Sequence, residues 1–202
     1  MLLKTMTVGP VETNCYLVGD EQAGACALVD PGDSAQALLS MVEESGLRLE
    51  AIFLTHGHYD HRDAVADILE KYPELPVYIH EKEKLRPGLP ERYFYGGPCQ
   101  PYAEGDTVQV GSIPFRVLET PGHTAGSVTL VTSGVMLSGD TLFAGTCGRC
   151  DLPGGSIADM LASLRRLGEL EGDYQVLPGH GPASTLEQER RRNPYVRQAM
   201  RR

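Results

Sequence analysis

Short apolar segments recur along the chain and are separated by turn-forming residues. Each segment is rich in Val, Ile or Leu and is bounded by Gly, Pro or Asp, a pattern that predicts β-strands. The predicted strands are Leu2–Val8, Cys15–Val18, Cys26–Val29, Ala51–Leu54, Val77–Ile79, Phe115–Leu118, Val128–Val131, Val135–Leu137 and Tyr174–Leu177.

Helical spacing of apolar residues occurs between these strands. Ser34, Ser156 and Thr185 carry hydroxyl groups that can cap a helix start, and Gly46 and Pro73 are expected to stop the first two helices. The predicted helices start after Ser34, at Asp63, after Ser156 and after Thr185, with a short tail helix after Pro194.

This order of elements predicts the architecture. Many strands with a few helices at uneven intervals favour two packed sheets with helices outside. The length of 202 residues suits a single domain, 1–202, with a short helical tail at about 185–202. The stretch from Glu81 to Asp106 is rich in Pro, Gly and Tyr and lacks periodicity, so we expect a long loop that covers part of the site.

Four of the predicted strands share a second feature. Each leads through a short turn, in three cases through a glycine, into a side chain that can bind a metal ion. Strand ends are rigid, and neighbouring sheet edges would bring these side chains together in one pocket. The four side chains are His56, His123, Asp140 and His180.

The densest cluster of metal-capable residues is the segment Thr55–His61. His56 and His58 are two residues apart, and in an extended turn they project to the same side. Asp60 and His61 follow where a helix begins, and they could serve a second ion about 3.5–4 Å from the first. Five of the six histidines follow the strand-end pattern; the sixth, His80, precedes a charged run and is expected at the surface.

Asp30 follows a predicted strand in the sequence Val29-Asp30-Pro31-Gly32. One interpretation is that its carboxylate caps the tight Pro-Gly turn. The other is that it lies behind the metal site and orients a ligand histidine. The sequence leaves both interpretations open.

Composition narrows the functional classes. The net charge of -9 disfavours nucleic-acid binding, and no run of about 18 apolar residues predicts a membrane span. The N-terminus lacks the features of a signal peptide, so a cytoplasmic location is expected. The five cysteines are expected to be free thiols, with Cys15 and Cys26 buried and a redox role for the Cys147–Cys150 pair as an alternative.

The motif His56-x-His58-x-Asp60-His61, with His123, Asp140 and His180 downstream, resembles the metallo-β-lactamase superfamily. Within it, the segment Gly139–Arg149 is similar to that of the glyoxalase II group, the hydroxyacylglutathione hydrolases. Only about twenty residues follow Pro182, so the chain resembles the short glyoxalase II-like proteins, and Arg62-Asp63 replaces the small glycines common in the family.

The resemblance implies an α+β fold, a four-layer αββα sandwich. It also implies His56, His58 and His123 on one metal, Asp60, His61 and His180 on the other, and Asp140 as a bridge. The implied cofactors are two divalent ions, with zinc as the first choice and iron or manganese as alternatives. Asp60 and Asp140 are then the catalytic carboxylates, and Arg149 is the candidate for substrate binding.

The function that this resemblance implies is hydrolysis of a small-molecule thioester, S-lactoylglutathione or a related acyl-thiol, by a metal-bridging hydroxide. A mononuclear iron persulfide dioxygenase of the same superfamily and a lactonase are alternatives. A non-catalytic metal-binding module is the alternative from another class. No nucleic acid or membrane is expected as a partner, and the sequence leaves the oligomeric state open.

Overall fold

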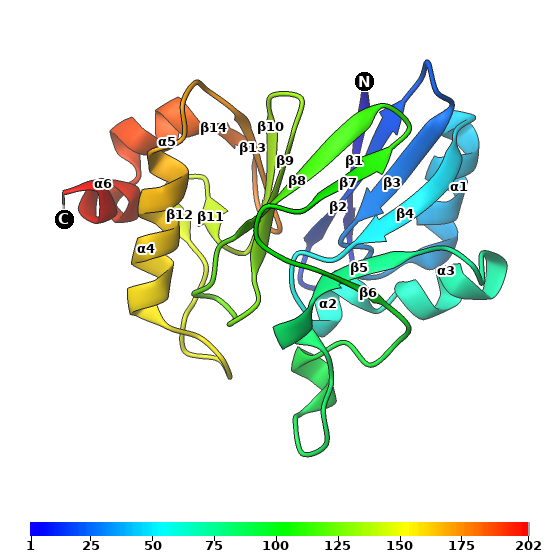
Figure 1. The fold of residues 1–202 in the computed structure, drawn as a ribbon, viewed down its shortest axis with the longest axis horizontal. Helices are drawn as coiled ribbons and strands as arrows, with labels where there is room; N and C mark the ends of the chain where they lie inside the picture. Colours follow the sequence, from blue (N-terminus) through cyan, green and yellow to red (C-terminus); the bar gives the residue numbers. More distant parts are fainter. Residues whose placement is uncertain (202) are drawn as a thin grey trace.

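Two six-stranded β-sheets face each other, with helices on their outer sides, in the computed structural model, which describes residues 1–201 (Figure 1). The first sheet has the order β1 (Leu2–Val8), β2 (Thr13–Asp20), β3 (Ala25–Val29), β4 (Arg48–Phe53), β5 (Val77–His80) and β6 (Gln100–Tyr102). The second sheet has the order β14 (Ser184–Thr185), β13 (Gln175–Pro178), β10 (Val135–Gly139), β9 (Val128–Thr132), β8 (Ile113–Glu119) and β7 (Thr107–Val110). A two-stranded ribbon is formed by β11 (Leu142–Phe143) and β12 (Thr146–Cys147).

The helices lie on the two outer faces of the sandwich (Figure 1). On the side of the first sheet are α1 (Ala35–Ser45), α2 (Tyr59–Arg62) and α3 (Val65–Lys71). On the side of the second sheet are α4 (Ile157–Gly168), α5 (Leu186–Arg192) and α6 (Pro194–Met200). Two short 3-10 helices, η1 (Glu81–Glu83) and η2 (Glu91–Tyr93), follow β5.

Three apolar cores hold these layers together. The core between the sheets contains Phe53, which stacks on Phe115 with ring centroids 4.7 Å apart. A second core lies under α1 and α3, and a third joins the second sheet to α4, α5 and α6. Burial of large apolar side chains in each of the three interfaces is the main stabilising contribution. The four-layer αββα sandwich expected from the sequence is therefore confirmed.

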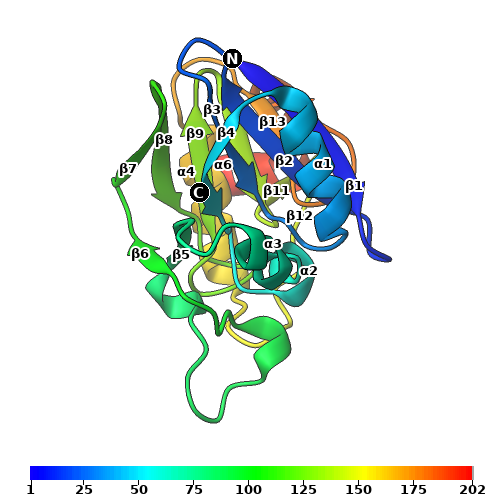
Figure 2. The ribbon, with the colours of Figure 1, turned by 90° about the vertical axis from the view of Figure 1, so that its right-hand side faces the viewer.

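Strand direction explains why the candidate residues meet. In the first sheet β3 and β4 are parallel, so both end at the same edge. In the second sheet β10 and β13 are parallel, and β8 runs in the same direction because β9 is antiparallel to both β8 and β10. The turns that follow β4, β8, β10 and β13 consequently gather at one end of the sandwich, in the lower part of Figures 1 and 2.

The two sheets are joined at this same end. Thr13, at the start of β2, forms an isolated antiparallel bridge with His180. The backbone N–H of Asn14 donates to the carbonyl of Gly179 at 2.7 Å, and the Asn14 side chain donates to the carbonyl of Pro178 at 3.1 Å. These bonds tie the first strands of the chain to its last long strand.

The nine predicted strands are all present, with small differences in their bounds. Five further strands were missed: β6, β7, β11, β12 and β14. They have two to four residues each, too few for alternation to be visible. The expected long loop at 81–106 contains η1, η2 and β6, so it is more ordered than the sequence indicated.

The helix termini agree with the predicted caps in most places. The hydroxyls of Ser156 and Thr185 each accept the backbone N–H three residues further along the chain, at 3.2 Å in both cases, and Gly46 ends α1 in the left-handed region. The prediction for Ser34 was wrong: it has φ 57, and its hydroxyl donates to Asp33 instead of capping α1. In residues 1–201, no helix has the length and apolar character needed to cross a bilayer.

Candidate metal centre

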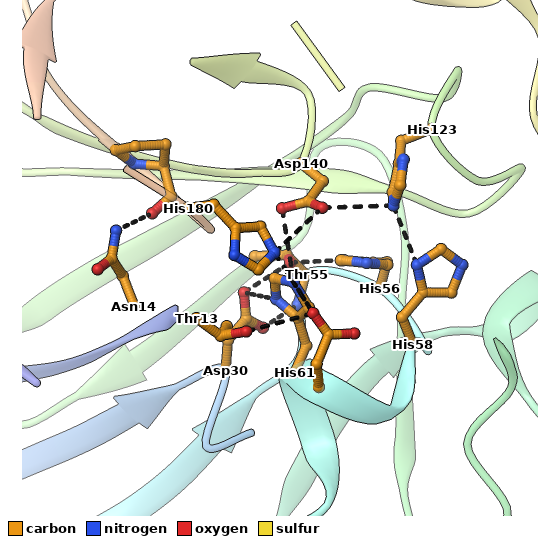
Figure 3. A network of polar contacts seen from close by, with 12 residues as sticks. Thr13, Asn14, Asp30, Thr55, His56, His58, His61, His123, Asp140 and His180 are labelled. Atoms are coloured by element: carbon orange, nitrogen blue, oxygen red, sulfur yellow. Dashed lines mark hydrogen bonds and ion pairs between the residues drawn. The ribbon is translucent and has the colours of Figure 1, made fainter. Parts of the chain in front are cut away.

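All seven predicted side chains meet at the end of the sandwich where the strands converge. Figure 3 labels the five histidines of this cluster and Asp140. His56 and His58 lie in the turn between β4 and α2, and α2 itself carries Asp60 and His61. The other three come from the turns that follow β8, β10 and β13, and they are His123, Asp140 and His180.

The cluster divides into three overlapping triads of residues. In each triad every residue offers one ligand atom, and the three ligand atoms lie within 4.8 Å of one another. Two of the triads are His56, His58 and His123, which we call the histidine triad, and Asp60, His61 and His180, which we call the carboxylate triad. The third, His56, His61 and Asp140, joins them. Each could hold a metal ion, so the arrangement offers two adjacent sites.

Asp140 lies between the two triads. Its Oδ2 is 3.4 Å from Nε2 of His123 in the histidine triad and 3.6 Å from Nε2 of His180 in the carboxylate triad. Its Oδ1 is 3.5 Å from Nε2 of His61. A carboxylate in contact with both sides is placed to be shared by two cations.

Four of the histidines use Nδ1 to bind the protein and turn Nε2 towards the cluster. His61 bonds Asp30 at 3.0 Å, and His56 lies 3.1 Å from the hydroxyl of Thr55. The other two donate to backbone carbonyls: His123 to Arg149 at 2.7 Å and His180 to Val11 at 3.1 Å. Ligand histidines in metal sites are usually oriented in this way, through the nitrogen that does not face the metal.

Several atoms at the centre of the cluster are buried without a hydrogen-bond partner. A buried polar atom that is left unpaired costs about 1–3 kcal/mol. Three such atoms belong to one of the triads, and a buried group of this kind indicates a shared ligand. Imidazole nitrogens and a carboxylate oxygen suit a borderline divalent cation, so the residues fit the metal pair that the sequence predicted. The three atoms are Nε2 of His56, Nε2 of His61 and Oδ1 of Asp140, whereas His58 faces the cluster with Nδ1, 3.0 Å from Nε2 of His123.

The two triads differ in their electrostatics. Burial, reinforced by the neighbouring imidazoles, lowers the pKa of His56 and His58, in the case of His58 to about 3. Burial acts in the same direction on His61, but Asp140 and Asp30 outweigh it and raise its pKa to about 9. Burial opposes ionisation of Asp60 as well, yet His180 and His61 hold the pKa of that carboxyl well below its usual range. The neutral forms of His56 and His58 are therefore favoured in the histidine triad, whereas in the carboxylate triad the charged forms of Asp60 and His61 stabilise each other.

Asp30 has the geometry expected of a carboxylate behind a metal ligand. It is buried, and its Oδ2 accepts from His61 at 3.0 Å and from the hydroxyl of Thr55 at 2.7 Å. Its Oδ1 accepts the backbone N–H of Thr55 at 2.7 Å. Asp30 also adopts φ 53, but every hydrogen bond of its carboxylate goes to Thr55 or His61 and none to the Pro31-Gly32 segment, so the geometry supports the orienting interpretation and not the cap.

Gly179 allows the strand ends to approach so closely. A Cβ at this position would lie 2.2 Å from Oδ1 of Asp140 and 2.7 Å from a carbon of the His61 ring. Any side chain would push Asp140 and His61 out of the cluster.

The cluster opens into a cavity of about 490 Å³, a size that suits a small organic ligand. His58, Asp60, Asp140 and the other inner residues form its floor, and aromatic side chains stand around it. Its rim includes Val11, Tyr59, Arg92, Tyr93, Phe143, Arg149 and Leu152.

Two arginines line this cavity. Arg149, the predicted substrate-binding residue, is exposed and donates two hydrogen bonds to Asp151, at 2.7 and 2.8 Å. Arg92 lies over the rings of Tyr59 and Tyr93, 5.3 Å from each centroid, and forms no ion pair with any carboxylate of residues 1–201. Sequence reasoning missed Arg92, because η2 is a three-residue turn within a segment of little periodicity.

The prediction that His80 lies at the surface was wrong. It is 6% exposed, and its Nε2 lies 3.0 Å from the Glu119 carboxylate of the opposite sheet. The charged run that follows suggested exposure, but β5 directs His80 inwards between the sheets. His80 belongs to none of the three triads. The cysteines are free as predicted, with Cys15 and Cys26 buried and Cys147 and Cys150 half-buried.

The fold and the strand-end cluster together define the class: a metallo-hydrolase sandwich with its site at one end of the two sheets. The chain belongs to the metallo-beta-lactamase superfamily, whose family model matches residues 8–180.

Individual relatives support this assignment. The hydroxyacylglutathione hydrolase GloC of Haemophilus influenzae is 32% identical over 209 residues, covering 97% of this chain and 98% of that protein. The crystal structure of BLEG-1 B3 metallo-beta-lactamase has a TM-score of 0.87 and 32% identity, covering 96% of this chain and 99% of its own. The crystal structure of TTHA1623 in a di-iron-bound form has a TM-score of 0.81 and 37% identity. The match covers 95% of this chain and 99% of the TTHA1623 chain.

Proposed function

We propose that this protein is a metal-dependent thioesterase that hydrolyses a small acyl-thiol, with S-lactoylglutathione as the first candidate. The observation that carries the proposal is the complete set of seven ligands, in which Asp140 contacts both triads. The similarity to a hydroxyacylglutathione hydrolase over almost the whole chain supports the choice of substrate class.

In this proposal the histidine triad holds one ion, the carboxylate triad holds the other, and Asp140 is shared. Zinc is our first assignment, since imidazole and carboxylate ligands suit it, with iron or manganese as alternatives. When bound, the two ions supply Lewis acidity that polarises a carbonyl and makes water at the site more acidic. The role of the chain is to keep the imidazoles of His56 and His58 neutral, to hold all five imidazoles in orientation, and to leave one side of the site open to the cavity.

The cavity accommodates the two parts of an acyl-thiol. The acyl carbonyl would reach the floor, where His58, Asp60 and Asp140 line the cavity. The thiol carrier would lie along the rim, beside Tyr93 and Arg149. A thiolate is a good leaving group, so no nucleophile from the protein is required.

The two rim arginines can recognise an anionic carrier such as a glutathione-derived group. A guanidinium binds a carboxylate through two parallel hydrogen bonds. Arg149 would have to release Asp151 to do so, whereas Arg92 has no such competitor among residues 1–201. We therefore propose that Arg92 contributes more than Arg149 to the binding of an anionic carrier.

The direct test is an assay of defined metal forms. Protein stripped of metal would be reloaded with Zn²⁺, Fe²⁺ or Mn²⁺, and thiol release from S-lactoylglutathione would be measured, with Asp140→Asn as the matched control. We expect turnover by at least one metal form and none by the control. A fully loaded protein that hydrolyses no thioester in a panel of several carriers would overturn the proposal.

The same preparation separates the alternatives. A persulfide dioxygenase would bind one iron and consume oxygen with glutathione persulfide, a result that the second, carboxylate triad argues against. Selective hydrolysis of lactones or of a β-lactam would identify a different hydrolase. Full metal loading without any turnover would identify a metal-binding module.

A further inference from the structure

A buried glutamate that the proposed reaction does not use lies behind the histidine triad. Glu83, the last residue of η1, is 1% exposed. Its Oε2 accepts the backbone N–H of Gly57 at 2.8 Å, and its Oε1 accepts the backbone N–H of Gly126 at 2.7 Å. Burial raises the pKa of Glu83, while these two N–H groups stabilise its ionised form.

The two N–H groups belong to the turns that carry the histidine triad. Gly57 lies between His56 and His58, and Gly126 lies three residues after His123. We propose that Glu83 is a positioning residue that holds these two turns in register, and thereby supports one of the two metal ions selectively. This inference rests on the metal site of the proposed function, though not on the identity of the substrate.

Close packing makes the connection rigid. A Cβ at Gly57 would lie 2.9 Å from the Glu83 carbonyl oxygen, and a Cβ at Gly126 would lie 2.8 Å from Oε1 of Glu83. The Glu83 backbone is itself fixed, because its carbonyl accepts the N–H of Tyr95 at 2.8 Å. Neither turn can move towards Glu83, and moving away would break a hydrogen bond to a buried carboxylate.

The carboxylate triad is held by other groups. Thr13 donates to Asp60 at 3.2 Å, Asp30 accepts from His61, and the carbonyl of Val11 accepts from His180. None of these bonds involves Glu83. Loss of the Glu83 carboxylate should consequently loosen one triad and leave the other in place.

The first test is Glu83→Gln, which keeps the size of the side chain but lets only one of the two N–H groups find an acceptor. The matched control is Glu189→Gln: Glu189 is also 1% exposed and accepts a backbone N–H, that of Gly145 at 2.8 Å, yet it contacts neither triad. Both variants neutralise a buried glutamate, so both are expected to lower the melting temperature.

Metal affinity separates the two variants. Zn²⁺ binding by the full-length apoprotein would be measured in competition with a chromophoric chelator. We expect Glu83→Gln to bind one Zn²⁺ as the parent protein does and the other roughly 10- to 100-fold more weakly, the usual effect of removing a group that orients metal ligands. Glu189→Gln should bind both ions normally. Equal weakening of both ions in Glu83→Gln, or no weakening, overturns the inference.

Two further variants identify the affected triad. In a His180→Ala background, where the histidine triad remains complete, adding Glu83→Gln should weaken the remaining Zn²⁺ and change the absorption spectrum of the Co²⁺ form. In a His123→Ala background, adding Glu83→Gln should change neither the affinity for the remaining Zn²⁺ nor the spectrum of the Co²⁺ form. Gly126→Ala adds a methyl group that would lie 2.7 Å from Nδ1 of His80 and 2.8 Å from Oε1 of Glu83, so it disturbs this carboxylate without removing its charge. It should reproduce the selective loss if Glu83→Gln folds poorly.

These outcomes also separate this inference from the proposed function. If the parent protein binds two Zn²⁺ and Glu83→Gln binds them equally well, only the inference fails. If the parent binds both ions but hydrolyses no thioester, only the proposed substrate class fails. If the parent binds no metal, both fail.

Discussion

The two halves of the metal centre have the same number of ligands but are built on different physical principles. The histidine triad consists of imidazoles that are almost fully buried, with exposures of 0% for His56, 4% for His58 and 3% for His123. In the carboxylate triad, the side chain of Asp60 is 16% exposed and that of His180 27%. The first half relies on desolvated imidazoles in turns whose backbone N–H groups bind Glu83. The second relies on the opposite charges of a carboxylate and an imidazole.

This contrast indicates how each half should behave. A neutral, enclosed site gains its affinity from preorganisation, so small displacements of a turn should be costly. A charged, more open site gains its affinity for a metal ion from electrostatic attraction. Such a site tolerates displacement of its ligands but exchanges ions with solvent more readily. One centre can thereby retain one ion firmly while the other remains accessible from the cavity.

The largest effect should follow from removing what the halves share. Asp140→Asn keeps the shape of the side chain but removes its charge between the two triads. We expect kcat for thioester hydrolysis to fall at least roughly 10³-fold, and the content of bound metal to fall from two ions to one or none. Steady-state kinetics with metal analysis would check this, and near-parental activity would refute a shared ligand.

A large but one-sided effect should follow from Asp30→Asn. The amide cannot accept from both Thr55 and His61 as the carboxylate does, so His61 loses its orientation. We expect Zn²⁺ affinity at the carboxylate triad to fall roughly 10- to 100-fold, with a faster phase of release to a chelator. Glu83→Gln is the reciprocal variant. If both substitutions affected the same ion, the two halves would not be independent.

A moderate effect, confined to substrate, should follow from the rim arginines. Arg92→Ala should raise KM for an anionic thioester about tenfold, the loss expected for one charge-assisted hydrogen bond. Arg149→Ala should raise it less, since Asp151 already binds that guanidinium. Neither should change KM for an uncharged thioester or the metal content. A larger effect of Arg149→Ala would reverse our ranking of the two.

The smallest effect on the centre should come from a position on the outer face. Gly46 ends α1 with φ 69, and a methyl group added there would meet no atom within 4 Å beyond its chain neighbours, so Gly46→Ala tests backbone strain alone. The left-handed conformation costs a non-glycine residue about 1–2 kcal/mol, which corresponds to a fall in Tm of about 2–8 °C. Calorimetry would measure the fall, and both ions should remain bound. Loss of either ion would show that the centre depends on global stability.

The positions of the seven cluster residues could be predicted from sequence because four of them follow apolar strands and the other three lie within five residues of His56. Strand periodicity fixes where a side chain lies along a sheet, and parallel direction brings strand ends together. His56 and Asp140 are predictable in this way although they are 84 positions apart. Their convergence required only that the two sheets pack face to face.

Glu83, Arg92 and His80 could not be placed by the same reasoning. They lie in or beside the segment 81–106, whose turns are shorter than any detectable period. The hydrogen-bond partners of Glu83 are backbone N–H groups. Every residue except proline has such a group, so no side-chain pattern in the sequence identifies these partners. The position of His80 depends on the opposite sheet, through Glu119, and tertiary contacts of this kind override the local charge pattern.

The join between Thr13 and His180 has a consequence for how the protein matures. The two residues are 167 positions apart, so this contact forms only after residue 180 has been synthesised. The carboxylate triad includes His180 and cannot close earlier, whereas the residues of the histidine triad all precede Thr124. Closure of the carboxylate triad is then coupled to the joining of the two sheets, because His180 lies at the bridge to Thr13.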